Sequence, residues 1–364
     1  MAFLVGYSSR AGKILALFLP RLPDAWNRTR STSTAGLMTL FGAFSLWALI
    51  TFHGGWTAFT ADRATALTKP GQEYLRQGVG LIPLAFLLVL TFSMGLKRGR
   101  LVVVLVGGLT LAILGFVNGS KFEMLYPLLA TVLVTHYLGS QQIGIRHLAT
   151  LTMGAVLVFP ILNHLRHNDS LATALTATRW TPTEVGEQLM ARFYGIDALT
   201  LCVRDTPEVM DFQYGSTIAP ILTAWIPRAI FPEKPVVTFG KVFGETYMKE
   251  HFAGTGTSAS PTLLGDAYIN FHLPGMLLVS FAYGAVLRTI YTWTIQSHFG
   301  APAVFLYIGT LPLGISAWEG AIGASLVLAA VRIIVLLSVV WLAGEWRRPR
   351  AAQTSVKSRI GQSS

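Results

Sequence analysis

Charged residues are scarce in this sequence. Asp, Glu, Lys and Arg make up 12% of its 364 residues, while 52% are hydrophobic; an ordinary soluble domain has roughly a quarter of its residues charged. The apolar residues form runs of about 15 to 20, the length a helix needs to cross a hydrocarbon core of about 30 Å. They lack the alternation of a barrel strand. The composition predicts an all-α, polytopic membrane protein.

Cysteine is nearly absent, because Cys202 is the only one. A single cysteine excludes an internal disulfide, and its apolar neighbours predict that it packs inside the protein. The alternative is the nucleophile of a membrane cysteine transpeptidase of the exosortase type. A cleavable signal peptide is not expected, since Arg10 and Lys13 interrupt the first apolar stretch. We expect residues 11–19 to form an interfacial helix or a frayed segment.

Metal and nucleotide motifs are also lacking. His164 and His167 lie one helical turn apart, but no further His or Cys is close in sequence to complete a metal site. The glycine-rich stretch from Gly254 lacks the Gly-Lys-Ser/Thr ending of a phosphate loop. We expect no metal and no cofactor.

About eight apolar runs are candidates for membrane spans. They cover residues 35–52, 80–96, 101–117, 125–138, 148–162, 273–289, 303–316 and 322–342. The predicted organisation is a basic N-terminal segment (1–34), five spans (35–163), one large outer loop (164–271), three spans (272–344) and a basic tail (345–364). An internal repeat, which would favour a transporter, is not visible.

Basic residues predict the orientation. The net charge of +11 could indicate a nucleic-acid partner, but much of the excess lies in the two terminal segments. Basic patches that flank spans are typical of cytoplasmic anchors against anionic lipid headgroups. We therefore expect both termini in the cytoplasm and membrane lipid, not nucleic acid, as a partner. The large loop has eight Lys or Arg against eleven Asp or Glu between Arg166 and Asp266, so it lies outside.

The first half of this loop predicts a helix that begins near Thr181 and carries one misplaced cation. An apolar stripe at helical spacing contains Val185, Leu189, Phe193, Ile196, Leu199 and Val203. At 100° per residue, Arg192 projects into the middle of this stripe. It is either a snorkelling or paired structural arginine or an anion ligand that faces the membrane.

A proline-rich string follows. The run 218–226 is too short to span, and Pro227, Pro232 and Pro235 flank Arg228 and Lys234. Proline lowers the entropy lost when a segment is ordered, so this string could hold two cations in fixed places at the interface. The alternative is a solvated loop with ordinary charges.

These segments together resemble the bacterial oligosaccharide repeat-unit polymerases, also called O-antigen or Wzy polymerases. The resemblance covers roughly residues 100–290. It rests on strings that begin at Gly119 (Gly-Ser-Lys), Arg192 (Arg-Phe-Tyr-Gly), Tyr214 (Tyr-Gly-Ser), Ile226 (Ile-Pro-Arg to Lys-Pro), Ser260 (Ser-Pro) and Gly265 (Gly-Asp-Ala-Tyr-Ile-Asn-Phe). Relatives often have Gly-Glu where this chain has Gly265-Asp266, and Asn-Phe-Gly where it has Asn270-Phe271-His272.

The resemblance implies a glycosyltransferase of the bacterial inner membrane. The growing glycan on undecaprenyl diphosphate would be transferred to a newly flipped lipid-linked repeat unit, making an O-antigen, capsule or exopolysaccharide. Its substrate would be the undecaprenyl-diphosphate-linked oligosaccharide, and a chain-length regulator and a flippase would be partners. A flippase or carrier of the same lipid, or an O-antigen ligase, are the alternatives.

This chemistry predicts the site residues. Cations should neutralise the charge on the diphosphate leaving group. The candidates are Arg192, Arg228 and Lys234, with Arg166 and Arg204 behind them, and Tyr268 and Asn270 beside the substrate. A carboxylate should take the proton of the acceptor hydroxyl. Asp266 is the first candidate for this base and Asp197 the second, with a plain ion-pair partner as the alternative for each.

Overall fold

The computed structural model describes residues 1–61, 72–94, 121–139, 194–226, 239–249 and 259–346, with short pieces between them. This part of the chain is mostly helical, and five of its helices are long and apolar enough to cross a membrane: Arg28–Phe52, Tyr74–Ser93, Thr262–Gln296, Ala301–Glu319 and Ile322–Ala343. The predicted run 125–138 lies in a shorter apolar helix. The run 148–162 and much of 101–117 lie outside the described residues, so the total of eight spans stays a prediction.

The first of these helices, α3 (Arg28–Phe52), has small residues inside and large apolar residues outside. Its N-terminus is capped by the side chain of Asn27, which accepts a hydrogen bond from the Arg30 backbone N–H. A Cβ on Gly42 would lie 2.5 Å from Ile82, so α3 and the helix that contains Ile82 approach closely. The exposed apolar side chains are Leu37, Leu40, Phe41, Phe44 and Trp47. Small residues at helix contacts and large apolar ones outside are typical of helices that face lipid.

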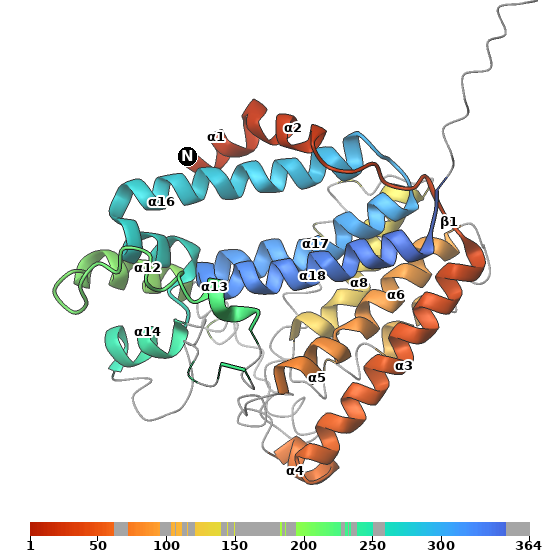
Figure 1. Cartoon of the computed structure of the whole chain (residues 1–364), viewed down its shortest axis with the longest axis horizontal. Helices are drawn as coiled ribbons and strands as arrows, with labels where there is room; N and C mark the ends of the chain where they lie inside the picture. Colours follow the sequence, from red (N-terminus) through yellow and green to blue (C-terminus); the bar gives the residue numbers. More distant parts are fainter. Residues whose placement is uncertain are drawn as a thin grey trace, which may run out of the picture.

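The core lies between α6 (Leu81–Ser93), α8 (Lys121–Leu138), α17 (Ala301–Glu319) and α18 (Ile322–Ala343). Leu87, Leu88 and Phe305 are fully buried there. α5 (Gln72–Val79) leads into α6, and α4 (Trp56–Ala61) follows α3 at the far end of the bundle (Figure 1). The short strand β1 (Ala25–Trp26) pairs antiparallel with β2 (Gly344–Glu345) and so joins the start of α3 to the end of α18.

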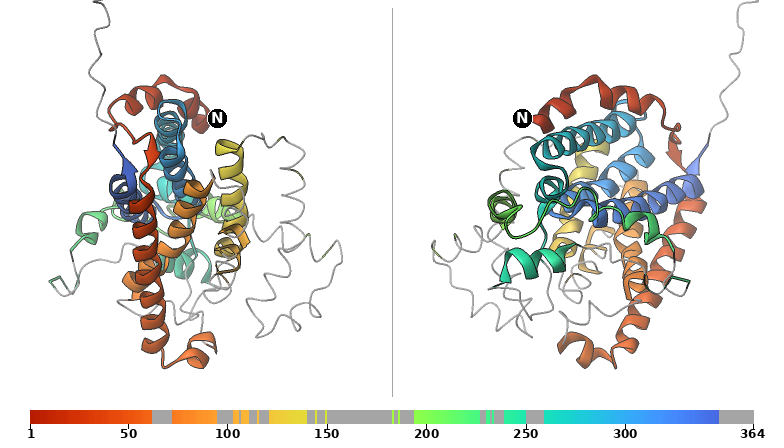
Figure 2. Two further views of the ribbon diagram at one scale, coloured as in Figure 1. Left: turned by 90° about the vertical axis from the view of Figure 1, so that its right-hand side faces the viewer. Right: turned by 60° about the vertical axis from the view of Figure 1, so that its left-hand side comes forward.

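The N-terminal segment forms two helices, α1 (Ala2–Ser8) and α2 (Arg10–Leu17), that lie along α16 (Thr262–Tyr291) (Figures 1 and 2). Glycines allow this contact, since a Cβ on Gly6 would collide with the backbone of Phe281 and one on Gly12 with Arg288. The segment is thus helical and packed against a candidate span, which contradicts the frayed alternative; its position at the membrane interface stays a prediction. Met1 lies at the end where α16 begins, and β1 and β2 lie at the other.

Helix α16 also begins earlier than predicted. The loop was expected to run to Phe271, but the helix starts at Thr262 and is interrupted only at Phe271 and His272, where the backbone is not helical. Buried side chains from Leu263 to Asn270 show why this first part is ordered: it packs inside the protein. The π-helix η2 (Thr292–Gln296) extends its other end. The described parts of the predicted loop add three helices, α12 (Tyr194–Asp205), α13 (Ile221–Ala224) and α14 (Gly240–Tyr247).

Candidate functional site

A buried polar network lies where α16, α18 and the segment after α12 meet. Oδ1 of Asp266 accepts hydrogen bonds from Thr217 Oγ1 at 2.8 Å and from Asn270 Nδ2 at 2.9 Å. Oδ2 accepts one at 2.8 Å from the backbone N–H of Ile322, the first residue of α18. The carboxylate therefore satisfies a free N–H at a helix N-terminus, where negative charge is also favoured by the helix dipole.

Asn270 joins this network to the loop. It lies four residues after Asp266, on the same face of α16, and its Nδ2 lies 2.6 Å from Thr217 Oγ1. Its Oδ1 accepts a hydrogen bond at 2.8 Å from the backbone N–H of Gly215. Both Asp266 and Asn270 have no exposed surface. Two strings that suggested the polymerase resemblance, Tyr214-Gly215-Ser216 and the Gly265 to Phe271 string, thus lie in contact.

The segment after α12 enters the network through a tight turn. Tyr214 and Gly215 both have positive φ, 48° and 92°, and the N–H of Ser216 donates to the carbonyl of Gln213 at 2.8 Å. Two successive residues with positive φ are the pattern of a type I′ turn, which favours glycine. A Cβ on Gly215 would also lie 3.4 Å from the ring of Phe271. Glycine is therefore required here by the backbone conformation.

Helix α12 packs on α16 through small residues. Ala198 and Cys202 are fully buried, and a Cβ on Gly265 would lie 2.8 Å from Cys202 Sγ. The predicted apolar stripe is not this contact face, because Ile196 and Val203 are exposed. Small side chains let the two helices approach closely. The face of α12 that packs on α16 is therefore the one with small residues, and not the one with the most apolar residues. The prediction that Cys202 packs inside is confirmed.

The same burial decides the reactivity of the cysteine. Burial raises the pKa of the Cys202 thiol to about 12, and the charge of Asp266 adds to the shift. A nucleophilic cysteine needs a thiolate near neutral pH, which a lowered pKa provides. The environment of Cys202 is the opposite of what a transpeptidase nucleophile requires.

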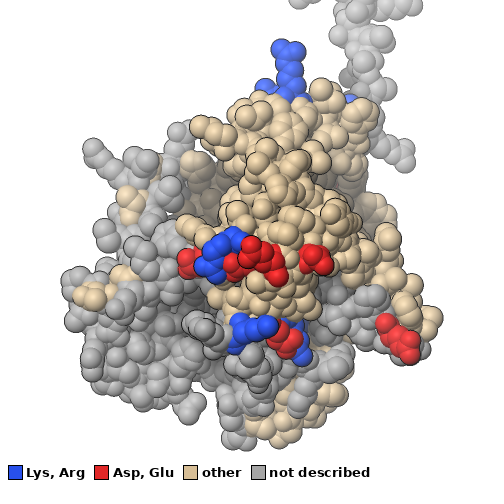
Figure 3. All heavy atoms as spheres, turned by 90° about the vertical axis from the view of Figure 1, so that its left-hand side faces the viewer, with Lys and Arg blue, Asp and Glu red and all other residues tan. Residues whose placement is uncertain are grey.

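Four of the five predicted cations, Arg166, Arg192, Arg228 and Lys234, lie outside the described residues. The fifth, Arg204, forms a forked ion pair with its neighbour Asp205, through Nε at 2.5 Å and Nη2 at 2.9 Å. This hydrogen bonding lowers the pKa of the Asp205 carboxyl. At the end of the molecule that carries α12 and α14, described basic and acidic side chains lie next to one another (Figure 3). The predicted diphosphate-binding cluster therefore stays a prediction.

Two further predicted site residues, Asp197 and Tyr268, have different surroundings. Asp197 is exposed on α12 and is not bonded to the Asp266 network. Tyr268 is buried, and its ring centroid lies 6.0 Å from that of Phe212 and 5.1 Å from that of His272. Its contacts are thus with aromatic rings of the protein.

His272 occupies the position at which the polymerase resemblance led us to expect glycine. Its backbone has φ 59° and ψ −161°, a combination that is almost confined to glycine. Its ring packs at a tilt against Phe212 and Tyr268, with the centroids of His272 and Phe212 5.2 Å apart. The backbone therefore has a glycine-like bend at the end of this string, at a residue that carries a ring.

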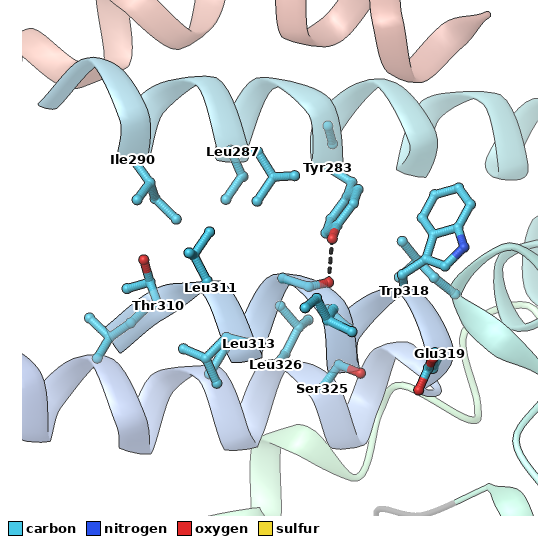
Figure 4. Close-up of a pocket in the computed structure, with 18 of the residues that line it drawn as sticks. Tyr283, Leu287, Ile290, Thr310, Leu311, Leu313, Trp318, Glu319, Ser325 and Leu326 are labelled. Carbon is cyan, nitrogen blue, oxygen red and sulfur yellow. Dashed lines mark hydrogen bonds between the residues drawn. The ribbon is translucent and has the colours of Figure 1, made fainter. Parts of the chain in front are cut away.

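An apolar cavity of about 680 Å³ extends from this network along α16, α17 and α18. Leu263 and Ile322 line it near the network, and Tyr291 and Tyr307 line it toward the other end. The hydroxyl of Tyr283 donates a hydrogen bond to the Gly314 carbonyl across it (Figure 4). Its size falls within the range of small-molecule sites, about 300–1,000 Å³.

Sequence reasoning missed two members of the network, and it did not predict the cavity. Thr217 directly follows the Tyr-Gly-Ser string, so extending that string by one residue would have found it. The backbone N–H of Ile322 had no sequence signal. Glu319 lines the cavity and ends α17.

Comparison with known proteins adds one match. The family described as a domain of unknown function (DUF8712) matches residues 164–307. No curated protein and no solved structure matches the chain. The matched range contains Thr217, Asp266 and Asn270, whereas α18, whose N-terminus Asp266 caps, lies outside it.

Proposed function

We propose that this chain is a membrane glycosyltransferase that joins undecaprenyl-diphosphate-linked oligosaccharide repeat units into a long polysaccharide. The observation that carries the proposal is the contact between Gly215 and Asn270. These residues belong to two strings of the polymerase resemblance, lie 55 residues apart in sequence, and are joined by a hydrogen bond. Strings that serve one site are expected to meet in the fold, and these two do.

The cavity supports a lipid substrate. It runs along three candidate spans, and its lining is largely apolar, as a polyprenyl chain would need. One end lies at the buried network, which faces the segments of the predicted outer loop. A lipid whose chain lay in this cavity would hold its polar head near that loop.

In this proposal Asp266 is a positioning residue. A general base must come within hydrogen-bond reach of the proton it takes. Asp266 has no exposed surface, and both its oxygens are occupied by protein donors. Its geometry favours holding the Thr217 segment and α18 in place, so the earlier prediction that Asp266 is the base is not part of this proposal.

The test uses purified protein in liposomes with a lipid-linked repeat unit. Lengthening of the glycan is expected, and translocation of the lipid without lengthening would overturn the proposal in favour of a carrier. Transfer to a different lipid acceptor without lengthening would favour a ligase. Arg192→Ala and Arg228→Ala are tested in the same assay: if both lengthen the glycan at the wild-type rate, the predicted cation cluster is wrong and the polymerase function stands.

A further inference from the structure

Glu319 is a carboxylate at the mouth of the apolar cavity. It is the last residue of α17 and is exposed. Among the described residues that line this cavity, it is the only acidic or basic one. In Figure 4 it lies with Trp318 and Ser325 at one end of the cavity, away from Ile290 and Thr310 at the other. A charged group at one end gives the cavity a polar and an apolar end.

Two carboxylates at the junction of α16, α17 and α18 have opposite surroundings. Asp266 binds the backbone N–H of Ile322, and Glu319 lies three residues before Ile322 in the chain. Asp266 is fully buried and hydrogen-bonded, whereas within the described structure Glu319 has neither a hydrogen bond through its side chain nor an ion pair. Glu319 is therefore the carboxylate of this junction that an entering molecule can reach.

The charge of Glu319 limits what can bind beside it. An ionised carboxylate repels a phosphate, because like charges a few ångströms apart are unfavourable. It accepts hydrogen bonds from hydroxyl groups, which sugars carry in abundance. At the mouth of the cavity Glu319 therefore suits a sugar hydroxyl, and the diphosphate of a lipid in the cavity has to lie toward the loop, away from this carboxylate.

We infer that Glu319 is the general base that takes the proton from the acceptor hydroxyl, an inference that rests on the proposed function. The hydroxyl oxygen forms a bond to the anomeric carbon of the donor sugar while its proton moves to a Glu319 oxygen. The bond between that carbon and the phosphate oxygen breaks, and the electron pair leaves with the lipid diphosphate. Glu319 then returns the proton to water.

The test compares Glu319→Gln with wild type in the liposome elongation assay. Gln keeps the size of the side chain but cannot take a proton, so kcat should fall by about 10²–10⁴-fold while KM stays unchanged. Glu319→Asp keeps a carboxylate and should regain at least part of this loss. Glu208→Gln, an exposed Glu on the segment after α12, is the matched control and should elongate as wild type does.

The outcomes separate the two proposals. If wild type lengthens the glycan and Glu319→Gln does so at the same kcat, the base is another group and the polymerase function stands. A change in KM alone would assign Glu319 to binding and overturn its role as the base. If wild type fails to lengthen the glycan, the proposed function fails. Equal melting temperatures of wild type and Glu319→Gln show that a lost rate is not lost folding, and Glu319→Asp repeats the comparison if they differ.

Discussion

The backbone N–H of Ile322 donates a hydrogen bond to the side chain of Asp266, 56 residues earlier in the chain, at 2.8 Å. This bond fixes the start of α18 to the first part of α16. The same carboxylate accepts a hydrogen bond from Thr217 in the segment after α12, so a single side chain connects three segments. The stability of the network should therefore depend on Asp266.

Replacing Asp266 by Ala should destabilise the protein by about 3 kcal/mol or more. The change leaves the donors of Thr217, Asn270 and Ile322 short of an acceptor, and each buried donor without one costs about 1–3 kcal/mol. Asp266→Asn keeps one acceptor oxygen and should cost less. Unfolding of the purified protein in detergent measures the effect. Asp197→Ala, at an exposed carboxylate, is the control and should stay within about 0.5 kcal/mol of wild type; a similar value for Asp266→Ala would contradict the prediction.

His272→Gly should be more stable than His272→Ala by about 1–3 kcal/mol. Both variants lose the ring contacts with Phe212 and Tyr268, but only Gly relieves the backbone at φ 59° and ψ −161°. Comparing the two variants isolates the backbone strain from the ring packing. The measurement is again unfolding in detergent. Equal stability of both variants would show that the bend carries no strain.

Single cysteines placed at the two ends of the bundle should be labelled from opposite sides of the membrane. The background is Cys202→Ala, which removes the only cysteine. Ala2→Cys lies at the end where α16 begins, and Glu345→Cys lies where α18 ends. An impermeant maleimide applied to intact cells should label only one of them, because α16 and α18 are candidate spans. Two cytoplasmic termini, as the basic residues predict, would leave both cysteines unlabelled until the cells are permeabilised, and that result would contradict this prediction.

The apolar runs predicted several helices closely. The last two candidate spans were expected at 303–316 and 322–342 and are found at Ala301–Glu319 and Ile322–Ala343. Hydropathy works here because α17 and α18 have few polar residues to interrupt the run. Hydropathy failed at α16, because the first part of this helix contains the polar residues Asp266 and Asn270. Their polar groups are hydrogen-bonded inside the protein, so the helix includes residues that precede the apolar run.

The site was predictable only within short stretches of sequence. Asp266, Tyr268 and Asn270 belong to one string, and the four-residue spacing of Asp266 and Asn270 places them on one helical face. Their contacts with Thr217 and Ile322 join residues 49 and 56 positions apart. Local periodicity contains no information on such pairings. The packing face of α12 was also missed, because close approach at Gly265 favours small residues over the most apolar stripe.

The pairing of β1 with β2 has a consequence for biosynthesis. Ala25 pairs with Glu345 and Trp26 with Gly344, so the partner of this early strand leaves the ribosome more than 300 residues later. Trp26 also packs against Phe305 of α17. The first described candidate span must therefore wait in the bilayer, with its preceding strand unpaired, until the last has been inserted. Assembly of the bundle is completed after translation of its final helix, and a chain stalled before that point would expose the Trp26 side chain to the quality-control machinery of the cell.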